Sequence, residues 1–139
     1  MIKVTENFYV SSQISEEHIN NLKEQGFNLV ICNRPNGEES GQTDFELIEA
    51  SCKQEEIDFV NLPMIPGSLS TELITETKVL IDKNVKTLAY CRTGTRCINI
   101  WACANAIDSD VNETIELATD AGYDLDYLRP LLNELNSTS

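Results

Sequence analysis

The chain is best understood from the stretch Ala89-Tyr90-Cys91-Arg92-Thr93-Gly94-Thr95-Arg96-Cys97. The apolar run over residues 87–90 has the character of a buried strand, and the residues from Cys97 onward suit a helix. Between them lies Cys91-Arg-Thr-Gly-Thr-Arg96, which we call the cysteine loop.

The cysteine loop has the residue types that hold an anion beside a nucleophile. Gly94 allows the backbone to curl so that successive N–H groups point inward. The start of the following helix adds free N–H groups and the positive end of its dipole, and both effects favour the thiolate form of Cys91. Arg96 adds a planar guanidinium that can bind two oxygens of a guest anion. The loop therefore predicts a reactive cysteine in an anion-binding site.

The composition predicts one soluble domain, 139 residues long and 41% hydrophobic, with a disordered tail from about residue 136. The formal net charge of −13 argues against nucleic acid and membranes as partners. We expect a cytoplasmic protein, because the apolar runs suit neither a bilayer span nor a signal peptide. An anionic substrate depends on a local cluster of the ten Lys and Arg, of which Arg92 and Arg96 lie in the cysteine loop.

The five cysteines read as thiols, because no pair has Cys-x-x-Cys spacing. His18 is the only histidine and lies in a polar segment, so we expect no metal, no cofactor and no Cys-His catalytic pair. Cys97 is interpreted either as a small apolar residue or as a thiol that resolves an oxidised Cys91. The others are expected in the core: Cys32, Cys52 and Cys103.

Hydrophobic periodicity predicts an α/β fold with a mostly parallel central sheet of four to five strands flanked by helices. The first two strands form a hairpin, and Pro130 kinks or restarts the last helix. Ligands bind beyond the carboxyl ends of parallel strands, where Cys91 lies. The expected strands cover residues 2–4, 8–10, 27–32, 57–62 and 87–90, and the expected helices cover residues 15–26, 43–55, 71–83, 97–107, 111–121 and 125–135.

Several segments together resemble the phosphatase-like domain of the beta-lactamase hydrolase-like proteins, over residues 2–107. They are Phe8-Tyr-Val-Ser-Ser-Gln-Ile14, Gly26-Phe27, Asn33-Arg-Pro-Asn-Gly-Glu38, Tyr90-Cys-Arg-Thr-Gly-Thr-Arg96 and Asn99-Ile-Trp-Ala102. The resemblance implies a protein-tyrosine-phosphatase-like fold with a thiolate at the base of a phosphate-binding loop. The family's domain also occurs fused to a metallo-hydrolase module concerned with persulfide oxidation, which implies a protein partner in persulfide metabolism.

Two departures from phosphatases favour sulfur chemistry. Phosphatases of this fold hold five residues between cysteine and arginine, whereas the cysteine loop holds four, a length that resembles rhodaneses. The segment 63–70, where a phosphatase would carry its general acid, has no Asp or Glu. Such an acid contributes about 10²–10⁴-fold to a rate, but sulfur transfer releases a stable thiolate or sulfite and needs no proton.

We therefore expect a Cys91-dependent enzyme that transfers sulfane sulfur through a persulfide. The alternatives are a tyrosine or dual-specificity type of phosphatase that forms a phosphocysteine, and an inactive anion-binding regulatory module. The expected substrate is a small anion, either a sulfane sulfur donor or a phosphate monoester. Arg34 and Glu38 follow another strand and are expected at the same rim, where Arg34 binds the anion or forms a structural ion pair. The predicted catalytic residues are Cys91 and Arg96, and the predicted anion-binding residues are Arg92, Thr93, Gly94, Thr95 and Arg34.

Overall fold

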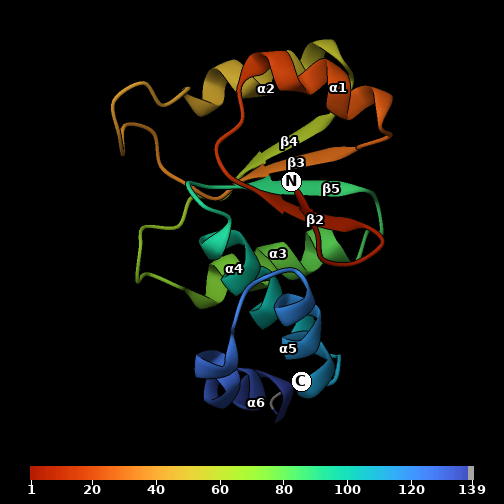
Figure 1. Cartoon of the computed structure of the whole chain (residues 1–139), viewed down its shortest axis with the longest axis vertical. Coiled ribbons are helices and arrows are strands. Elements are labelled where there is room, and N and C mark those ends of the chain that lie inside the picture. The colour runs from red at the N-terminus through yellow and green to blue at the C-terminus, as the bar shows by residue number, and fades with distance from the viewer. Residues whose placement is uncertain (138–139) are drawn as a thin grey trace.

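The computed structural model describes residues 1–137 and contains one five-stranded sheet with the order β1-β2-β5-β3-β4 (Figure 1). β1 pairs with β2 in antiparallel orientation, and the other neighbouring strands are parallel. The predicted hairpin and the predicted mostly parallel sheet are therefore confirmed. The strands are β1 (Ile2–Lys3), β2 (Phe8–Ser11), β3 (Leu29–Cys32), β4 (Asp58–Asn61) and β5 (Thr87–Tyr90).

Helices cover both faces of the sheet. Figure 1 shows α1 and α2 on one side and α3, α4, α5 and α6 on the other. None of the helices within residues 1–137 is long and apolar enough to cross a membrane. The helices are α1 (Ile19–Glu24, after a 3₁₀ turn at Glu16–His18), α2 (Phe45–Gln54), α3 (Thr71–Ile81), α4 (Thr95–Ala106), α5 (Val111–Asp120) and α6 (Arg129–Ser137, after a 3₁₀ turn at Asp126–Leu128).

Strand β5 places the cysteine at the centre of the sheet's carboxyl edge. Its four residues are all buried, with Ala89 in the core on the α4 side and Leu88 and Tyr90 in the core on the α2 side. This alternation is the two-residue period of a strand packed on both faces. The Cys91 N–H donates to the Ser11 carbonyl at the end of β2, at 3.1 Å. The cysteine loop therefore begins at the carboxyl edge of the sheet, next to the segments that follow β2 and β3.

Helix α4 begins at Thr95, two residues earlier than predicted. Gly94 precedes it with a positive φ of 86°, a conformation that glycine adopts at little cost. Because α4 starts earlier, Arg96 and Cys97 lie in its first turn, next to the cysteine loop.

The last helix restarts next to Pro130, at Arg129, which is one of the two alternatives predicted. Pro130 lies in the first turn of α6, where its missing N–H leaves no helical hydrogen bond unmade. The disordered tail was expected from about residue 136, and Asn136 lies in the last turn of α6. Its side-chain amide donates to the Ala106 and Ser109 carbonyls at 3.0 and 3.1 Å. These bonds hold the end of α6 against the turn after α4, and residues 138–139 lie outside the described part of the chain.

Candidate active site

The Cys91 sulfur lies buried beneath the cysteine loop, and the loop's amides face it. The side chain of Cys91 has no solvent-exposed surface, and the Gly94 N–H donates to its Sγ at 3.1 Å. The backbone N–H groups of Cys97, Thr93 and Arg96 also stabilise the sulfur's negative charge. Donors from the loop glycine and from the start of α4 therefore both favour the thiolate.

The Cys97 thiol adds a donor that the sequence did not predict. Its hydrogen bond to Cys91 is the largest influence that lowers the pKa of Cys91 to about 5, with the backbone N–H groups adding to it and burial opposing it. Burial raises the pKa of Cys97 well above its ordinary value, so Cys97 keeps the proton that it donates. The two thiols form a donor and acceptor pair in which Cys91 carries the charge.

We expect the rate of Cys91 alkylation by iodoacetamide to rise through about pH 5 and to stay constant above neutral pH. The reason is that the thiolate reacts and the thiol does not, so the rate follows the deprotonated fraction. Mass spectrometry of the peptide that contains Cys91 measures this rate. The urea-unfolded chain is the control, and its Cys91 should titrate near the free-cysteine value of about 8.5. A folded-state midpoint close to that of the unfolded chain would contradict the ionised thiol and favour the inactive module.

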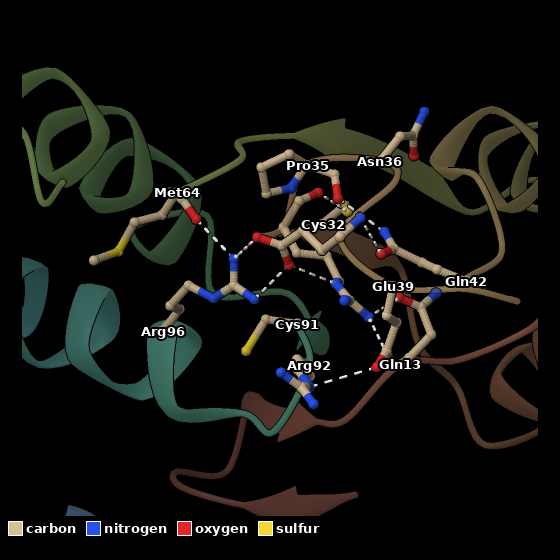
Figure 2. A network of polar contacts seen from close by, with 12 residues as sticks. Gln13, Cys32, Pro35, Asn36, Glu39, Gln42, Met64, Cys91, Arg92 and Arg96 are labelled. Carbon is tan, nitrogen blue, oxygen red and sulfur yellow. Dashed lines mark hydrogen bonds and ion pairs between the residues drawn. The ribbon is translucent and has the colours of Figure 1, made fainter. Parts of the chain in front are cut away.

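Arg96 is held beside the loop by two segments that are distant in sequence. Its Nη1 and Nη2 donate to the two Glu38 carboxylate oxygens at 3.0 and 2.7 Å, and Nη1 also donates to the Met64 carbonyl at 2.8 Å. Figure 2 shows Arg96 beside Met64, with Cys91 between Arg96 and Arg92. These bonds occupy three of the guanidinium's five N–H groups and leave Nε–H and one Nη2–H. Those two lie on one edge of the guanidinium plane, the arrangement that binds two oxygens of one anion.

Arg34 lies at the same rim as Glu38, but its guanidinium is buried in an ion-pair network. Its side chain is fully buried, and its Nε donates to Glu38 at 3.0 Å. Its Nη1 donates to Gln13 at 3.0 Å and to Glu39 at 3.4 Å. The pKa of Glu38 is lowered, first by Arg96 and also by Arg34. This geometry favours the structural ion pair over contact with a substrate, because Arg34 anchors the carboxylate that orients Arg96.

The remaining predicted residues of the loop differ in where their side chains lie. Arg92 is 65% exposed, and its Nε lies 3.5 Å from Glu39. The hydroxyls of Thr93 and Thr95 share a hydrogen bond of 3.0 Å with each other. The two threonine hydroxyls therefore pair with each other, and Arg92 extends its charged group toward solvent.

Tyr123 is a residue of the site that the sequence did not point to. It follows α5, and its hydroxyl donates to the Thr93 carbonyl at 3.0 Å. A Cβ added to Gly94 would overlap that hydroxyl oxygen. The positive φ of Gly94 favours glycine, and a larger residue would also displace the Tyr123 hydroxyl.

Comparison with sequence families and curated proteins agrees with the resemblance seen in the motifs. The profile of the family described as "Beta-lactamase hydrolase-like protein, phosphatase-like domain" matches residues 1–108. The beta-lactamase hydrolase-like protein of Xylella fastidiosa (strain Temecula1) is 23% identical over 128 residues, which cover 90% of this chain. The chain spans only 30% of the length of that relative.

Solved structures confirm the fold. A candidate phosphatase from Neisseria meningitidis Z2491 is 31% identical, with a TM-score of 0.81 and coverage of 96% of both chains. PTPMT1, at 10% identity and a TM-score of 0.76, covers 99% of this chain and 94% of its own, and shows the shared protein-tyrosine-phosphatase-like fold. Together with the profile match over residues 1–108, these similarities show that the chain belongs to the family of the phosphatase-like domain of beta-lactamase hydrolase-like proteins.

Proposed function

We propose that this chain is a hydrolase of phosphate monoesters that works through a phosphocysteine on Cys91. The observation that carries the proposal is the buried Cys91 sulfur, which accepts the Gly94 N–H and has a pKa of about 5. The sequence favoured sulfane sulfur transfer, but the similarity to the Neisseria candidate phosphatase supports phosphate as the first substrate class to test.

In the first step the Cys91 thiolate attacks phosphorus. A P–S bond forms, the P–O bond to the leaving group breaks, and that oxygen departs with the bonding electrons. In the second step water attacks phosphorus, the P–S bond breaks, and phosphate leaves with the thiolate restored. The low pKa of Cys91 serves both steps, because the thiolate is the attacking form and also a good leaving group.

The phosphoryl oxygens would be bound by the loop N–H groups and by the free edge of Arg96. Their charge becomes more diffuse in the transition state, where fixed donors are worth more than mobile water. Glu38 and the Met64 carbonyl hold the guanidinium in place before the substrate arrives. Arg92 adds an exposed positive charge next to the cysteine loop. Because the protein is strongly acidic overall, this local positive charge would favour the approach of an anion.

The loop between β4 and α3 lacks a general acid, and this limits which leaving groups the enzyme could release. Residues 63–70 contain no Asp or Glu that could protonate a departing alkoxide. Glu38 is ion-paired with Arg34 and Arg96, and its lowered pKa keeps it without a proton near neutral pH. We therefore propose monoesters whose leaving oxygen is stable without a proton, such as aryl phosphates.

The test is a series of phosphate monoesters with leaving groups of increasing pKa, assayed by phosphate release. We expect para-nitrophenyl phosphate to turn over about 10²-fold or more faster than an alkyl phosphate, the lower end of what a general acid contributes. Equal rates across the series would contradict the restriction on leaving groups. No phosphate release from any aryl ester would overturn the phosphatase proposal itself.

Sulfane sulfur transfer is the second candidate, and a specific observation favours it. The four residues between Cys91 and Arg96 match the loop length that resembles rhodaneses. With thiosulfate, the thiolate would attack the outer sulfur, the S–S bond would break, and sulfite would leave a Cys91 persulfide. A thiol or cyanide would then take that sulfur and restore the thiolate. A partner from persulfide metabolism, which the family resemblance implies, would be the natural acceptor.

Paired assays on one preparation distinguish the two candidates. Thiocyanate release from thiosulfate plus cyanide reports sulfur transfer, and phosphate release reports the phosphatase. Mass spectrometry after exposure to thiosulfate should show one added sulfur atom on Cys91 only if the second candidate holds. An unmodified Cys91 together with aryl phosphatase activity supports the first.

A further inference from the structure

The peptide group that joins Thr93 to Gly94 connects Tyr123 with the Cys91 sulfur. At one end its carbonyl accepts the Tyr123 hydroxyl at 3.0 Å, and at the other end its N–H donates to Cys91 Sγ at 3.1 Å. In a trans peptide the C=O and N–H point in opposite directions within one rigid plane. Fixing the carbonyl on the outer side of the loop therefore fixes the N–H on the inner side.

Gly94 makes this peptide able to rotate. Its φ is 86°, and glycine occupies positive and negative φ with similar ease, so little backbone strain opposes a flip of the peptide before it. A flipped peptide would turn the Thr93 carbonyl toward the thiolate in place of the Gly94 N–H. Such a loop would repel the Cys91 charge and an incoming anion, because a carbonyl oxygen carries negative partial charge.

The position of Tyr123 suits it to prevent the flip. The residue is half-buried after the end of α5, where its own N–H donates to the Ala118 carbonyl at 2.9 Å. It lies outside residues 1–108, the part of the chain that the family profile matches. Burial, and after it the charge of the Cys91 thiolate, raise the pKa of Tyr123, so the hydroxyl keeps its proton and remains a donor.

We propose that Tyr123 is a positioning residue that locks the cysteine loop in the orientation that stabilises the Cys91 thiolate. It acts on the sulfur through the Thr93–Gly94 peptide, because its hydroxyl bonds the carbonyl of that peptide and the N–H of the same peptide bonds the sulfur. The inference rests on the proposed function only in taking Cys91 as the nucleophile, and it holds equally for phosphoryl and sulfur transfer.

The test replaces Tyr123 with phenylalanine, which keeps the ring and removes only the hydroxyl. The matched control is Tyr127→Phe, because the Tyr127 hydroxyl is also hydrogen-bonded, to Asn99 Oδ1 at 2.7 Å. Asn99 donates to the Thr95 carbonyl in the first turn of α4, so Tyr127 has no bond to the Thr93–Gly94 peptide that faces the sulfur. We expect Tyr123→Phe to move the midpoint of Cys91 alkylation upward by about one pH unit, which corresponds to the loss of one hydrogen bond to a charged group. Tyr127→Phe should leave the midpoint unchanged, and thermal melts show that both variants are folded.

The outcomes distinguish a failure of the Tyr123 proposal from a failure of the proposed function. A wild-type midpoint near pH 5 that is the same in Tyr123→Phe would overturn the role of Tyr123 and leave the Cys91 thiolate intact. A wild-type midpoint near the free-cysteine value would instead remove the basis of the proposed function. The NMR chemical shift of the Gly94 N–H adds a second measurement, because loss of its bond to sulfur should shift that resonance in Tyr123→Phe but not in Tyr127→Phe.

Discussion

Replacing Cys91 with serine should abolish turnover, by about 10⁴-fold or more, since loss of a nucleophile removes the covalent route altogether. Serine is close in size and fits the same buried place, but its hydroxyl keeps its proton under conditions in which Cys91 is ionised. The loop donors then face a neutral group with little nucleophilic strength. Initial rates with para-nitrophenyl phosphate and with thiosulfate plus cyanide measure the loss for both candidate reactions.

Cys103→Ala is the matched control for this experiment. Cys103 is buried in α4, and burial raises its pKa to about 12, so it stays protonated and outside the chemistry. We expect this variant to keep its activity per folded molecule while losing one thiol, as Cys91→Ser does. A rate in Cys91→Ser within a few fold of the wild type would show that another group is the nucleophile.

Replacing Glu38 with glutamine should lower both the stability and the activity. Glu38 accepts hydrogen bonds from the fully buried Arg34 and from Arg96, and its own side chain is 21% exposed. Glutamine removes the negative charge and turns an N–H₂ group toward a guanidinium that needs acceptors. The free energy of unfolding should fall by about 2–3 kcal/mol, which is less than for a fully buried pair because Arg34 keeps Gln13 and Glu39.

Urea denaturation measures that change, and Glu39→Gln serves as its control. Glu39 is 42% exposed and makes the longer contacts to Arg34 and Arg92, at 3.4 and 3.5 Å. Its replacement should cost less than about 1 kcal/mol, as is typical of exposed ion pairs. Equal effects of the two substitutions would contradict the central role of Glu38 in the network.

Much of the fold could be predicted because its signals are local. Thr87–Tyr90 is a continuous apolar run, and the observed β5 has those bounds. Asp110 and Ser70 cap α5 and α3 by accepting backbone N–H groups three residues on, a pattern visible in the sequence. The start of α4 was misplaced because a glycine in the left-handed conformation serves as its N-cap, and that conformation depends on the loop as a whole.

The candidate site could be predicted only as far as the cysteine loop itself. Cys91, Gly94 and Arg96 lie within a few residues of one another, and their types indicate the chemistry. Glu38 could be placed at the same rim, but its paired contact with Arg96 crosses 58 positions of sequence. The Met64 carbonyl and the Tyr123 hydroxyl cross 32 and 30 positions. A backbone carbonyl carries no side-chain signal, and an isolated tyrosine carries little, so these contacts follow from the tertiary structure.

Strand β5 and most of α4 are buried, so the backbone groups that make Cys91 reactive lie at the edge of the protein core. The nucleophile lies between the central strand β5 and the mostly buried helix α4, so we expect it to belong to a region that opens late in native-state hydrogen exchange. Glu38, Met64 and Tyr123 lie in the connections between helices and strands, and they hold Arg96 and the cysteine loop from outside that region. Changes elsewhere in those connections can therefore alter what the site recognises, as long as the contacts of these three residues with Arg96 and the loop are kept.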